Sequence, residues 1–424
     1  MTAAFGWRNA LSYGLMGLPL AFAALPLYVI LPNHYAREFG VPLAALGAVL
    51  LGARLLDALI DPWLGRLNDR LMARSDRAVL AAGAAAAVVL ALGLLLLFFP
   101  QKVLAEPAVA DLLRWAALTL MLTYLGYSML SIAHQSWGAL LGGTQAQRGR
   151  ITGTREALAL VGVLLASVLP GVAGMPVALG VFAAWLALAW WTWHASVPPA
   201  RLPAADAPGS LWQPLRDARI RRLLGVFMLN GIASAVPATL VLFFVQDRLQ
   251  APASMEPAFL GVYFLSAAAS MPLWLALVRR LGLARSWLVG MVLAVLVFVW
   301  ASVLSAGDAT AFLVVCALSG VALGADLALP SAMLAGLLQQ RAMAGASFGW
   351  WNFAAKLNLA LAAGLALPLL QWFGYQPGAR DPQALQALTW AYCMLPCALK
   401  ALAAWSLYVG IIRAEGWPDQ EVSS

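Results

Sequence analysis

The chain has 424 residues, of which 63% are hydrophobic and only 10% charged, and its formal net charge at pH 7 is +8. Soluble domains carry about 25% charged residues, so this composition predicts an all-α integral membrane protein with many spans. We expect no nucleic acid partner, because the arginines lie in short loops rather than in a patch with exposed aromatics. The three cysteines and three histidines form no catalytic or metal-binding pattern, so we expect neither an enzyme nor a cofactor.

Twelve apolar segments are long enough to cross about 30 Å of hydrocarbon as helices. In chain order they lie at 10–32, 42–65, 77–99, 112–141, 152–174, 176–194, 220–246, 257–279, 284–305, 309–338, 344–373 and 387–411. A proline-rich polar connection divides them six and six. We therefore expect a six-helix bundle at 1–194, a cytoplasmic linker at 195–219 and a second six-helix bundle at 220–424.

The basic residues predict the orientation of the chain. With the N-terminus inside, 18 of the 26 lysines and arginines fall in inner loops and 5 in outer loops. Lys and Arg accumulate in the cytoplasmic loops of membrane proteins, so both termini are predicted to be cytoplasmic. The expected surroundings are the lipid bilayer of the plasma (inner) membrane, and we expect a monomer.

Three ionisable residues interrupt the second segment: Arg54, Asp57 and Asp61. On a helix they fall within about 60° of one another, so they form one stripe. A charge near the bilayer centre costs at least about 2.5–3.5 kcal/mol and normally marks a functional site. Two carboxylates one turn apart repel each other when both are ionised, so one tends to bind a proton or both share Na⁺. A structural ion pair between helices is the alternative interpretation.

The fourth segment carries further candidates. Thr123, Ser128 and Ser131 could supply oxygens to a bound cation if this segment packs beside the second one. His134 is either a proton relay or a packing residue held by a hydrogen bond.

Polar residues in the second half are interpreted in the same way. Asn352 could contact a solute or hydrogen-bond a neighbouring helix. Asp326, near the middle of the tenth segment, is expected to pair with Lys356 or Lys400. Its role could be structural or part of ion coupling.

The turn after the second segment reads Gly65-Arg66-Leu67-Asn68-Asp69-Arg70 and resembles the Gly-x-x-x-Asp-Arg signature of the major facilitator superfamily. Asp69 can accept hydrogen bonds from the N-terminus of a helix in the opposite bundle, where the helix dipole favours a carboxylate. We expect Gly65, Asp69 and Arg70 to form a cytoplasmic gate. A basic loop that only stops translocation is the alternative.

The pattern Arg54-x-x-Asp57-x-x-x-Asp61-Pro62-x-x-Gly65 resembles the helix-two motif of the glycoside–pentoside–hexuronide:cation symporters, the melibiose permease branch. Leu329–Ala335 and Gly349–Leu357 are similar to that family's segments around helices ten and eleven. The resemblance implies a major facilitator fold and symport by alternating access, with H⁺ or Na⁺ as the coupling ion.

The same resemblance implies roles for individual residues. Asp57 and Asp61 would bind the coupling cation and touch the sugar. Arg54 matches the family's helix-two arginine, Lys356 its helix-eleven lysine, and Arg155 the basic residue that opens helix five.

The chain also departs from the melibiose-type pattern in the fourth segment. Where those members carry an aspartate and, one turn on, an aromatic residue, this chain has Ser131 and Gln135. The missing carboxylate weakens the expectation of a sugar and favours H⁺. The leading interpretation is symport of a small polar solute such as a glycoside, and the alternative is a lysophospholipid or other amphiphile, since the same broad family includes lysophosphatidylcholine importers. An uncoupled lipid scramblase or a membrane sensor is a further alternative.

Overall fold

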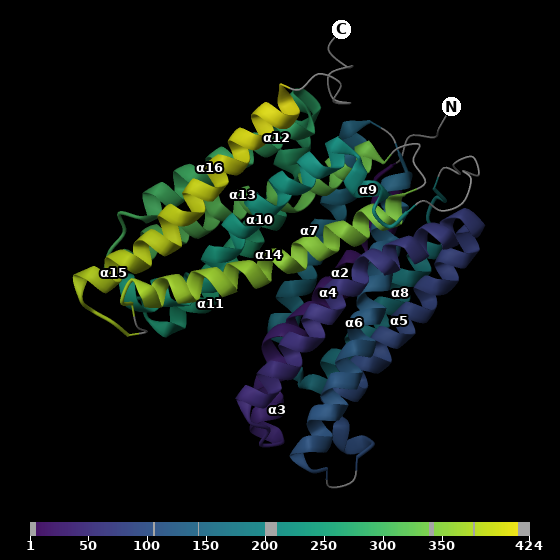
Figure 1. The fold of residues 1–424 in the computed structure, drawn as a ribbon, viewed down its shortest axis with the longest axis horizontal. Helices are drawn as coiled ribbons and strands as arrows, with labels where there is room; N and C mark the ends of the chain where they lie inside the picture. Colours follow the sequence, from purple (N-terminus) through teal and green to yellow (C-terminus); the bar gives the residue numbers. More distant parts are fainter. Residues whose placement is uncertain are drawn as a thin grey trace. The chain divides into compact units, whose positions relative to one another are not determined.

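The computed structural model describes residues 6–104, 107–142, 144–199, 210–338, 343–375 and 378–413, and the described chain is built from helices without strands (Figure 1). It divides into two compact units. The first contains Met1–Gly142, Thr154–Pro214 and Leu338–Phe353, and the second contains Gly143–Gly153, Leu215–Leu337 and Ala354–Ser424. Each half of the chain thus contributes a short segment to the unit formed mainly by the other half. The bundle boundaries expected from the sequence stay a prediction, and residues 200–209 of the expected linker lie outside the described residues.

The first unit begins with a helical run that changes from α-helix to π-helix at Pro26. The run consists of α1 (Trp7–Gly14), α2 (Gly17–Leu25), a π-helical turn (Pro26–Ile30) and α3 (Leu31–Glu38). The longer helices that follow are α4 (Leu43–Arg74), α5 (Asp76–Phe98), α6 (Val109–Leu140), α7 (Gln145–Ala173, from Thr154 on) and α8 (Met175–His194). Proline lacks the backbone N–H that an α-helix needs in its interior, which accounts for the local change of helix type.

Helix α4 runs nine residues beyond the predicted span 42–65, to Arg74. Its charged extension can stay helical outside an apolar environment because arginine and leucine both favour helices. Ser75 then ends α4 in an extended conformation and caps α5, accepting a hydrogen bond of 3.1 Å from the backbone N–H of Ala78.

The second unit is built from helices of the second half of the chain. They are α10 (Ala218–Phe243), α11 (Glu256–Ala269), α12 (Met271–Ala301), α13 (Ala309–Leu337), α14 (Ala344–Trp372, from Ala354 on), α15 (Pro382–Thr389) and α16 (Leu395–Leu407). Within α12, Gly282 has φ 79° and ψ 173°, a conformation that only glycine adopts without strain. The predicted turn between the eighth and ninth segments therefore falls at this glycine.

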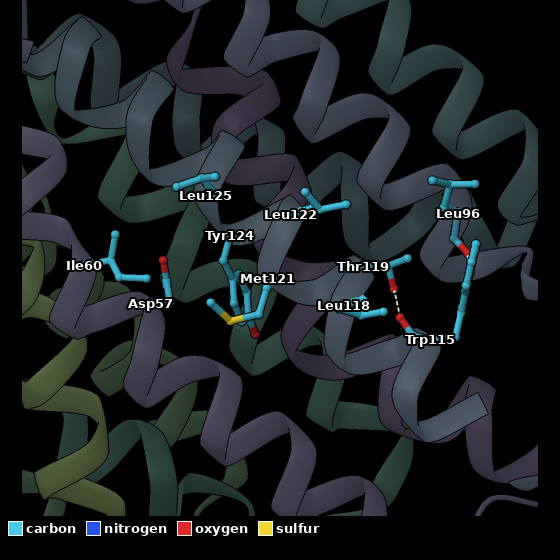
Figure 2. A pocket seen from close by; sticks show the side chains of 10 residues that line it. All are labelled: Asp57, Ile60, Leu96, Trp115, Leu118, Thr119, Met121, Leu122, Tyr124 and Leu125. Atoms are coloured by element: carbon cyan, nitrogen blue, oxygen red, sulfur yellow. Dashed lines mark hydrogen bonds between the residues drawn. The ribbon is translucent and has the colours of Figure 1, made fainter. Parts of the chain in front are cut away.

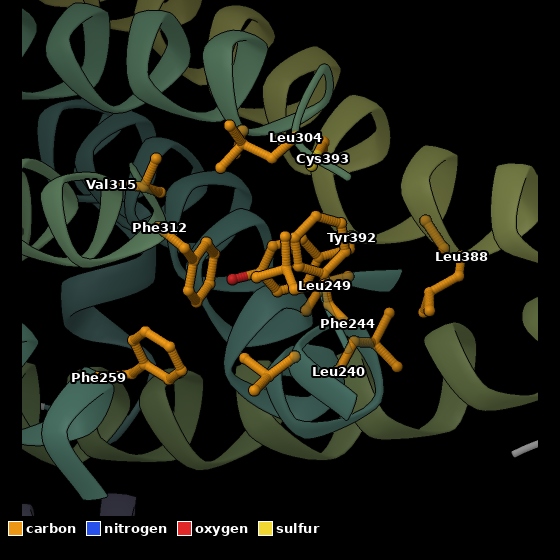
Figure 3. Close-up of a cluster of buried hydrophobic side chains, with 14 of the residues drawn as sticks. Leu240, Phe244, Leu249, Phe259, Leu304, Phe312, Val315, Leu388, Tyr392 and Cys393 are labelled. Atoms are coloured by element: carbon orange, nitrogen blue, oxygen red, sulfur yellow. The ribbon is translucent and has the colours of Figure 1, made fainter. Parts of the chain in front are cut away.

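An aromatic cluster forms the core of the second unit at one end (Figure 3). Phe244 stacks on Tyr392 with ring centroids 4.2 Å apart, and Phe312 meets Phe259 edge to face at 5.2 Å. These four rings come from the regions of α10, α11, α13 and the π-helical turn Trp390–Met394. Aromatic pairs in these geometries add about 0.5–1.5 kcal/mol each beyond burial, so the cluster ties four helical segments together.

Helices occupy all twelve predicted segments, and eight helical stretches in the described chain are long and apolar enough to cross a membrane. The eight are Asp76–Phe98, Val109–Leu140, Gln145–Ala173, Met175–His194, Ala218–Arg248, Met271–Ala301, Ala309–Leu337 and Pro382–Ile412. Helix α4 is not among them.

Candidate functional site

The two faces of α4 have opposite chemistry. Asp57 and Asp61 are 4% and 0% exposed, whereas Leu59 and Trp63 on the other side of the helix are 59% and 61% exposed. A soluble protein would turn these faces the other way round. The carboxylates therefore point into the first unit while the apolar face points outward, as expected for a charged stripe in a membrane helix.

Helix α6 supplies the polar partners of this stripe. The Ser128 hydroxyl donates a hydrogen bond of 2.9 Å to Oδ1 of Asp57. Arg54 hydrogen-bonds the hydroxyl of Tyr124, and the charges of Asp57 and Asp61 both act on the Tyr127 hydroxyl. The α4 stripe and these α6 side chains form one polar site inside the first unit, which we call the α4–α6 site.

The other predicted hydroxyls of α6 are used elsewhere. Thr123 donates to the carbonyl of Thr119 at 2.6 Å, within its own helix. Ser131 accepts a hydrogen bond of 2.8 Å from the side-chain amide of Gln135. Of the three hydroxyls considered as cation ligands, Ser128 is the one bonded to Asp57.

His134 joins α6 to α1. The Tyr13 hydroxyl donates to the His134 carbonyl at 2.8 Å, and Nε2 of His134 lies 2.8 Å from the Tyr13 carbonyl. Because a carbonyl only accepts, Nε2 carries the proton in this tautomer, and the two rings stack at 4.1 Å. This reciprocal pair in a fully buried position favours the packing interpretation of His134 over a proton relay.

Arg155 lies on α7 and pairs with its neighbour in the chain. Its Nε donates to Oε1 of Glu156 at 3.0 Å, and its guanidinium also hydrogen-bonds Tyr13. The charges of Arg155 and Glu156 both act on Tyr127 of the α4–α6 site. The structure therefore brings Arg155 into the same polar interior as Asp57.

The side chain of Asp69, near the C-terminal end of α4, lies at the N-terminus of α14. Its Oδ1 and Oδ2 accept hydrogen bonds from the backbone N–H groups of Gly345 and Ala346 at 2.6 and 2.8 Å. A Cβ on Gly65 would lie 2.2 Å from the Gly345 carbonyl oxygen, so glycine is needed for α4 to approach this closely. The exposed Arg70 takes no part in these two bonds. We call this contact the Asp69 gate.

The second unit contains a related contact that sequence reasoning missed. The side-chain carbonyl of Gln145, at the start of α7, accepts a hydrogen bond of 2.9 Å from the Leu283 backbone N–H, directly after Gly282. Thr152 on the same helix donates to the Ala328 carbonyl at 3.0 Å. The same kind of contact thus occurs twice. The N-terminus of α14 binds the carboxylate of Asp69 before the turn between α4 and α5, and the N-terminus of α7 binds the turn at Gly282 through the neutral amide of Gln145. The signal available in the sequence was the glycine that closes the basic turn Arg279-Arg280-Leu281-Gly282.

The Asp69 gate should respond to pH. Burial raises the pKa of Asp69 to about 7, against the opposing effect of the two N–H donors. When Asp69 is released into solvent its pKa returns to the ordinary value of 3.8, so the carboxyl group binds a proton more tightly in the closed gate than in the open one. The free energy that holds the gate closed is therefore greatest below about pH 4 and falls as the pH rises through 7. We expect release of the gate to become about tenfold more favourable between pH 6 and 8.

A buried reporter measures this release. Ser347→Cys places a thiol at a 2% exposed position of α14, in a background where Cys316, Cys393 and Cys397 are alanine. Maleimide labelling of the reporter is compared with the same protein carrying Asp69→Asn, which does not titrate, so that the pH dependence of the reagent cancels. A rate ratio that stays constant from pH 6 to 8 would contradict the prediction.

A buried ion pair joins four helices of the second unit. Nζ of Lys400 on α16 lies 2.6 Å from Oδ2 of Asp326 on α13 and donates at 2.8 Å to Ser234 on α10. Trp287 on α12 donates to Oδ1 of Asp326 at 2.9 Å. The partner of Asp326 is therefore Lys400.

The remaining sequence candidates lie on α14. Lys356 is half-buried in the part of α14 that belongs to the second unit, and Asn352 is half-buried in the part that belongs to the first. Tyr124, Tyr127 and Tyr13 were missed as site residues. Tyr124, Ser128 and Ser131 form a polar stripe at helical spacing in the sequence, and this stripe could have identified Tyr124 as a site residue.

The long apolar helices and the charges buried among them define a multi-pass membrane protein. The chain is similar in structure to a bacterial homologue of the iron transporter ferroportin in its outward-facing state, with a TM-score of 0.74 and 16% identity over 95% of this chain and 98% of that one. It is also similar to the fucose:proton symporter of E. coli, with a TM-score of 0.69 and 16% identity over 95% and 99% of the two chains.

Residues 12–412 match the family model described as MFS/sugar transport protein, so the chain belongs to this family of membrane transporters and is not an enzyme. Its sequence is 25% identical to the glucuronide carrier protein homolog of Escherichia coli (strain K12), over 95% of this chain and 92% of that protein. The resemblance noted in the helix-two motif is thus confirmed at the level of the family.

Proposed function

We propose that the protein is a secondary active transporter that couples the symport of a small polar solute, such as a glycoside, to H⁺ or Na⁺. The observation that carries this proposal is the α4–α6 site, in which Asp57 and Asp61 are buried one helical turn apart. Binding a cation at such a pair offsets the repulsion of two carboxylates, and releasing it restores that repulsion. The family and its glucuronide carrier relative support a sugar-like cargo.

The residues suggest how the site would work. Ser128 holds Oδ1 of Asp57 in position, which leaves the carboxylate able to exchange a proton or cation. Arg54 and Arg155 bring positive charge into the same interior as the two carboxylates, since each acts on a tyrosine hydroxyl on which Asp57 also acts. In our proposal twelve membrane helices rock between two access states with both termini cytoplasmic, and the Asp69 gate closes one side.

Solute uptake into proteoliposomes tests the proposal. We expect radiolabelled methyl β-D-glucuronide to accumulate against its gradient when an inward H⁺ or Na⁺ gradient is imposed, and to stop accumulating when an ionophore removes that gradient. Imposing the pH and Na⁺ gradients separately identifies the ion. Glycoside flux that ignores both gradients would indicate uncoupled transport of the solute, and uptake of labelled lysophosphatidylcholine without glycoside uptake would replace the proposed cargo with an amphiphile.

A further inference from the structure

Arg155 and Glu156 of α7 form an ion pair between neighbours in the chain. Side chains one residue apart on a helix do not face each other, so such a pair requires both side chains to bend. Here Nε and Nη2 of Arg155 both donate to Oε1 of Glu156, and the two side chains are 10% and 17% exposed. The guanidinium is therefore held in one position inside the first unit.

The helices α1 and α2 pack against Arg155 from the other side. A Cβ on Gly17 would lie 2.3 Å from the Arg155 carbonyl oxygen and 3.0 Å from its Cγ, so this contact requires glycine. The Tyr13 hydroxyl accepts a hydrogen bond from the Arg155 guanidinium and donates one of 2.8 Å to the His134 carbonyl. Glu156 and Tyr13 thus bond the guanidinium, while the backbone at Gly17 packs against its stem.

This pair faces the interior that holds the two carboxylates of α4. The Tyr127 hydroxyl on α6 lies within range of four charges, those of Asp57, Asp61, Arg155 and Glu156. The three carboxylates act on this hydroxyl in one direction and the guanidinium acts in the other. The α4 stripe and the α7 pair therefore act on one point of the first unit.

A pocket of about 450 Å³ lies beside Asp57, between α4, α5 and α6 (Figure 2). Figure 2 shows Asp57 close to Tyr124 and Met121 at one end, with apolar side chains along most of the rest. The described residues that line it include no arginine, no lysine and no second carboxylate. Positive charge near Asp57 comes instead from Arg54, which hydrogen-bonds Tyr124, and from Arg155.

The charges in this interior do not balance. Among the described residues whose charges reach the Tyr124 and Tyr127 hydroxyls, three carboxylates meet two guanidinium groups. The group carries one formal negative charge when all five are ionised, and one bound monovalent cation balances it. A low-dielectric interior favours such a balance. An Arg155 guanidinium released from Glu156 would be free to supply its positive charge to Asp57 and Asp61 instead.

We propose that Glu156 is a positioning residue of the coupling site: it holds Arg155 so that the guanidinium does not take the place of the coupling cation at Asp57 and Asp61. This inference rests on the proposed function and gives Glu156 a part in setting ion affinity. Glu156 acts through Arg155 and binds neither the ion nor the solute. With the guanidinium held, H⁺ or Na⁺ from solution neutralises the carboxylates of α4.

Uptake of radiolabelled methyl β-D-glucuronide into proteoliposomes, at varied concentrations of the coupling ion, measures this role. Glu156→Gln removes the charge with almost no change in volume and weakens the hydrogen bonds from Arg155, because the acceptor is then neutral. We expect the ion concentration at half-maximal rate to rise at least about tenfold, while the maximal rate changes by less than about twofold. A glutamate that only stabilises the fold would lower the maximal rate and leave that ion concentration unchanged.

Three further variants test the route through Arg155. Tyr13→Phe removes a hydrogen bond to Arg155 without changing any charge and should raise the same ion concentration about threefold. The double variant Glu156→Gln/Arg155→Gln restores one formal negative charge and removes the competing guanidinium, so the ion concentration should return to within about threefold of the unmodified protein. Glu38→Gln is the matched control, since Glu38 is 59% exposed on α3, and it should change the value less than about twofold.

The outcomes separate this inference from the proposed function. An unchanged ion concentration in both Glu156→Gln and Tyr13→Phe overturns the positioning role and leaves coupled transport intact. A rise in Glu156→Gln that persists undiminished in the double variant overturns the route through Arg155. If either glutamine variant gives no uptake, Tyr13→Phe decides: a rise supports the role and an unchanged value overturns it. Absence of ion-driven uptake by the unmodified protein overturns the proposed function together with this inference.

Discussion

Asp57→Asn and Asp61→Asn should each abolish gradient-driven accumulation and bring the ratio of internal to external solute to about 1. An amide resembles a carboxyl group that has permanently bound its proton, so the variant cannot bind and release the ion in each cycle. Both side chains are buried on one face of α4, where the substitution changes charge with almost no change in volume. We therefore expect folded protein that still equilibrates solute across the membrane.

The measurement is uptake into proteoliposomes under an imposed ion gradient, together with counterflow, in which labelled solute exchanges with unlabelled solute and no gradient is needed. Counterflow should persist in both variants. Asp111→Asn is the matched control, because Asp111 is 51% exposed in a surface ion pair with Arg114, at 3.6 Å, and such pairs contribute little. Uphill accumulation by both the Asp57 and the Asp61 variant would show that the coupling site is elsewhere.

The second large effect is expected at the Asp326–Lys400 pair. Lys400→Met should lower the free energy of unfolding by about 3–5 kcal/mol, because it leaves the buried carboxylate of Asp326 without its cation. The double variant Asp326→Asn/Lys400→Met should recover most of this loss. It removes both charges while the asparagine carbonyl can still accept the hydrogen bond from Trp287.

Denaturation in mixed detergent micelles measures these differences. Lys102→Met, at an exposed position, should change the free energy of unfolding by less than about 0.5 kcal/mol and controls for the loss of one lysine. A loss below about 1 kcal/mol for Lys400→Met would argue against a stabilising pair, since it would mean that Asp326 is stable without a cation. A double variant as unstable as the single one would point to lost packing of the lysine side chain instead.

The sequence predicted the features that depend on local chemistry. Charges inside an apolar run must turn inward, so the burial of Asp57 and Asp61 followed from their spacing on a helix. The same argument required a partner for Asp326. It could not choose between Lys356 and Lys400, because both lie on helices that could reach α13, and only the packing of α16 against α10 and α12 decides the pairing.

Features that depend on contacts between segments distant in the sequence could not be predicted from it. The position of 143–153 in the second unit and of 338–353 in the first depends on which helix ends meet, and no hydrophobic pattern encodes that choice.

The two segments that form the Asp69 gate place different demands on the sequence. One side is a specific carboxylate, but the other consists of the backbone N–H groups of Gly345 and Ala346, which every residue except proline possesses. These two N–H groups therefore require only that residues 345 and 346 are not proline, while the close approach of α4 requires glycine at 345 and, one turn on, at 349. A motif search can therefore find the carboxylate, but it cannot find the backbone N–H groups that bind it.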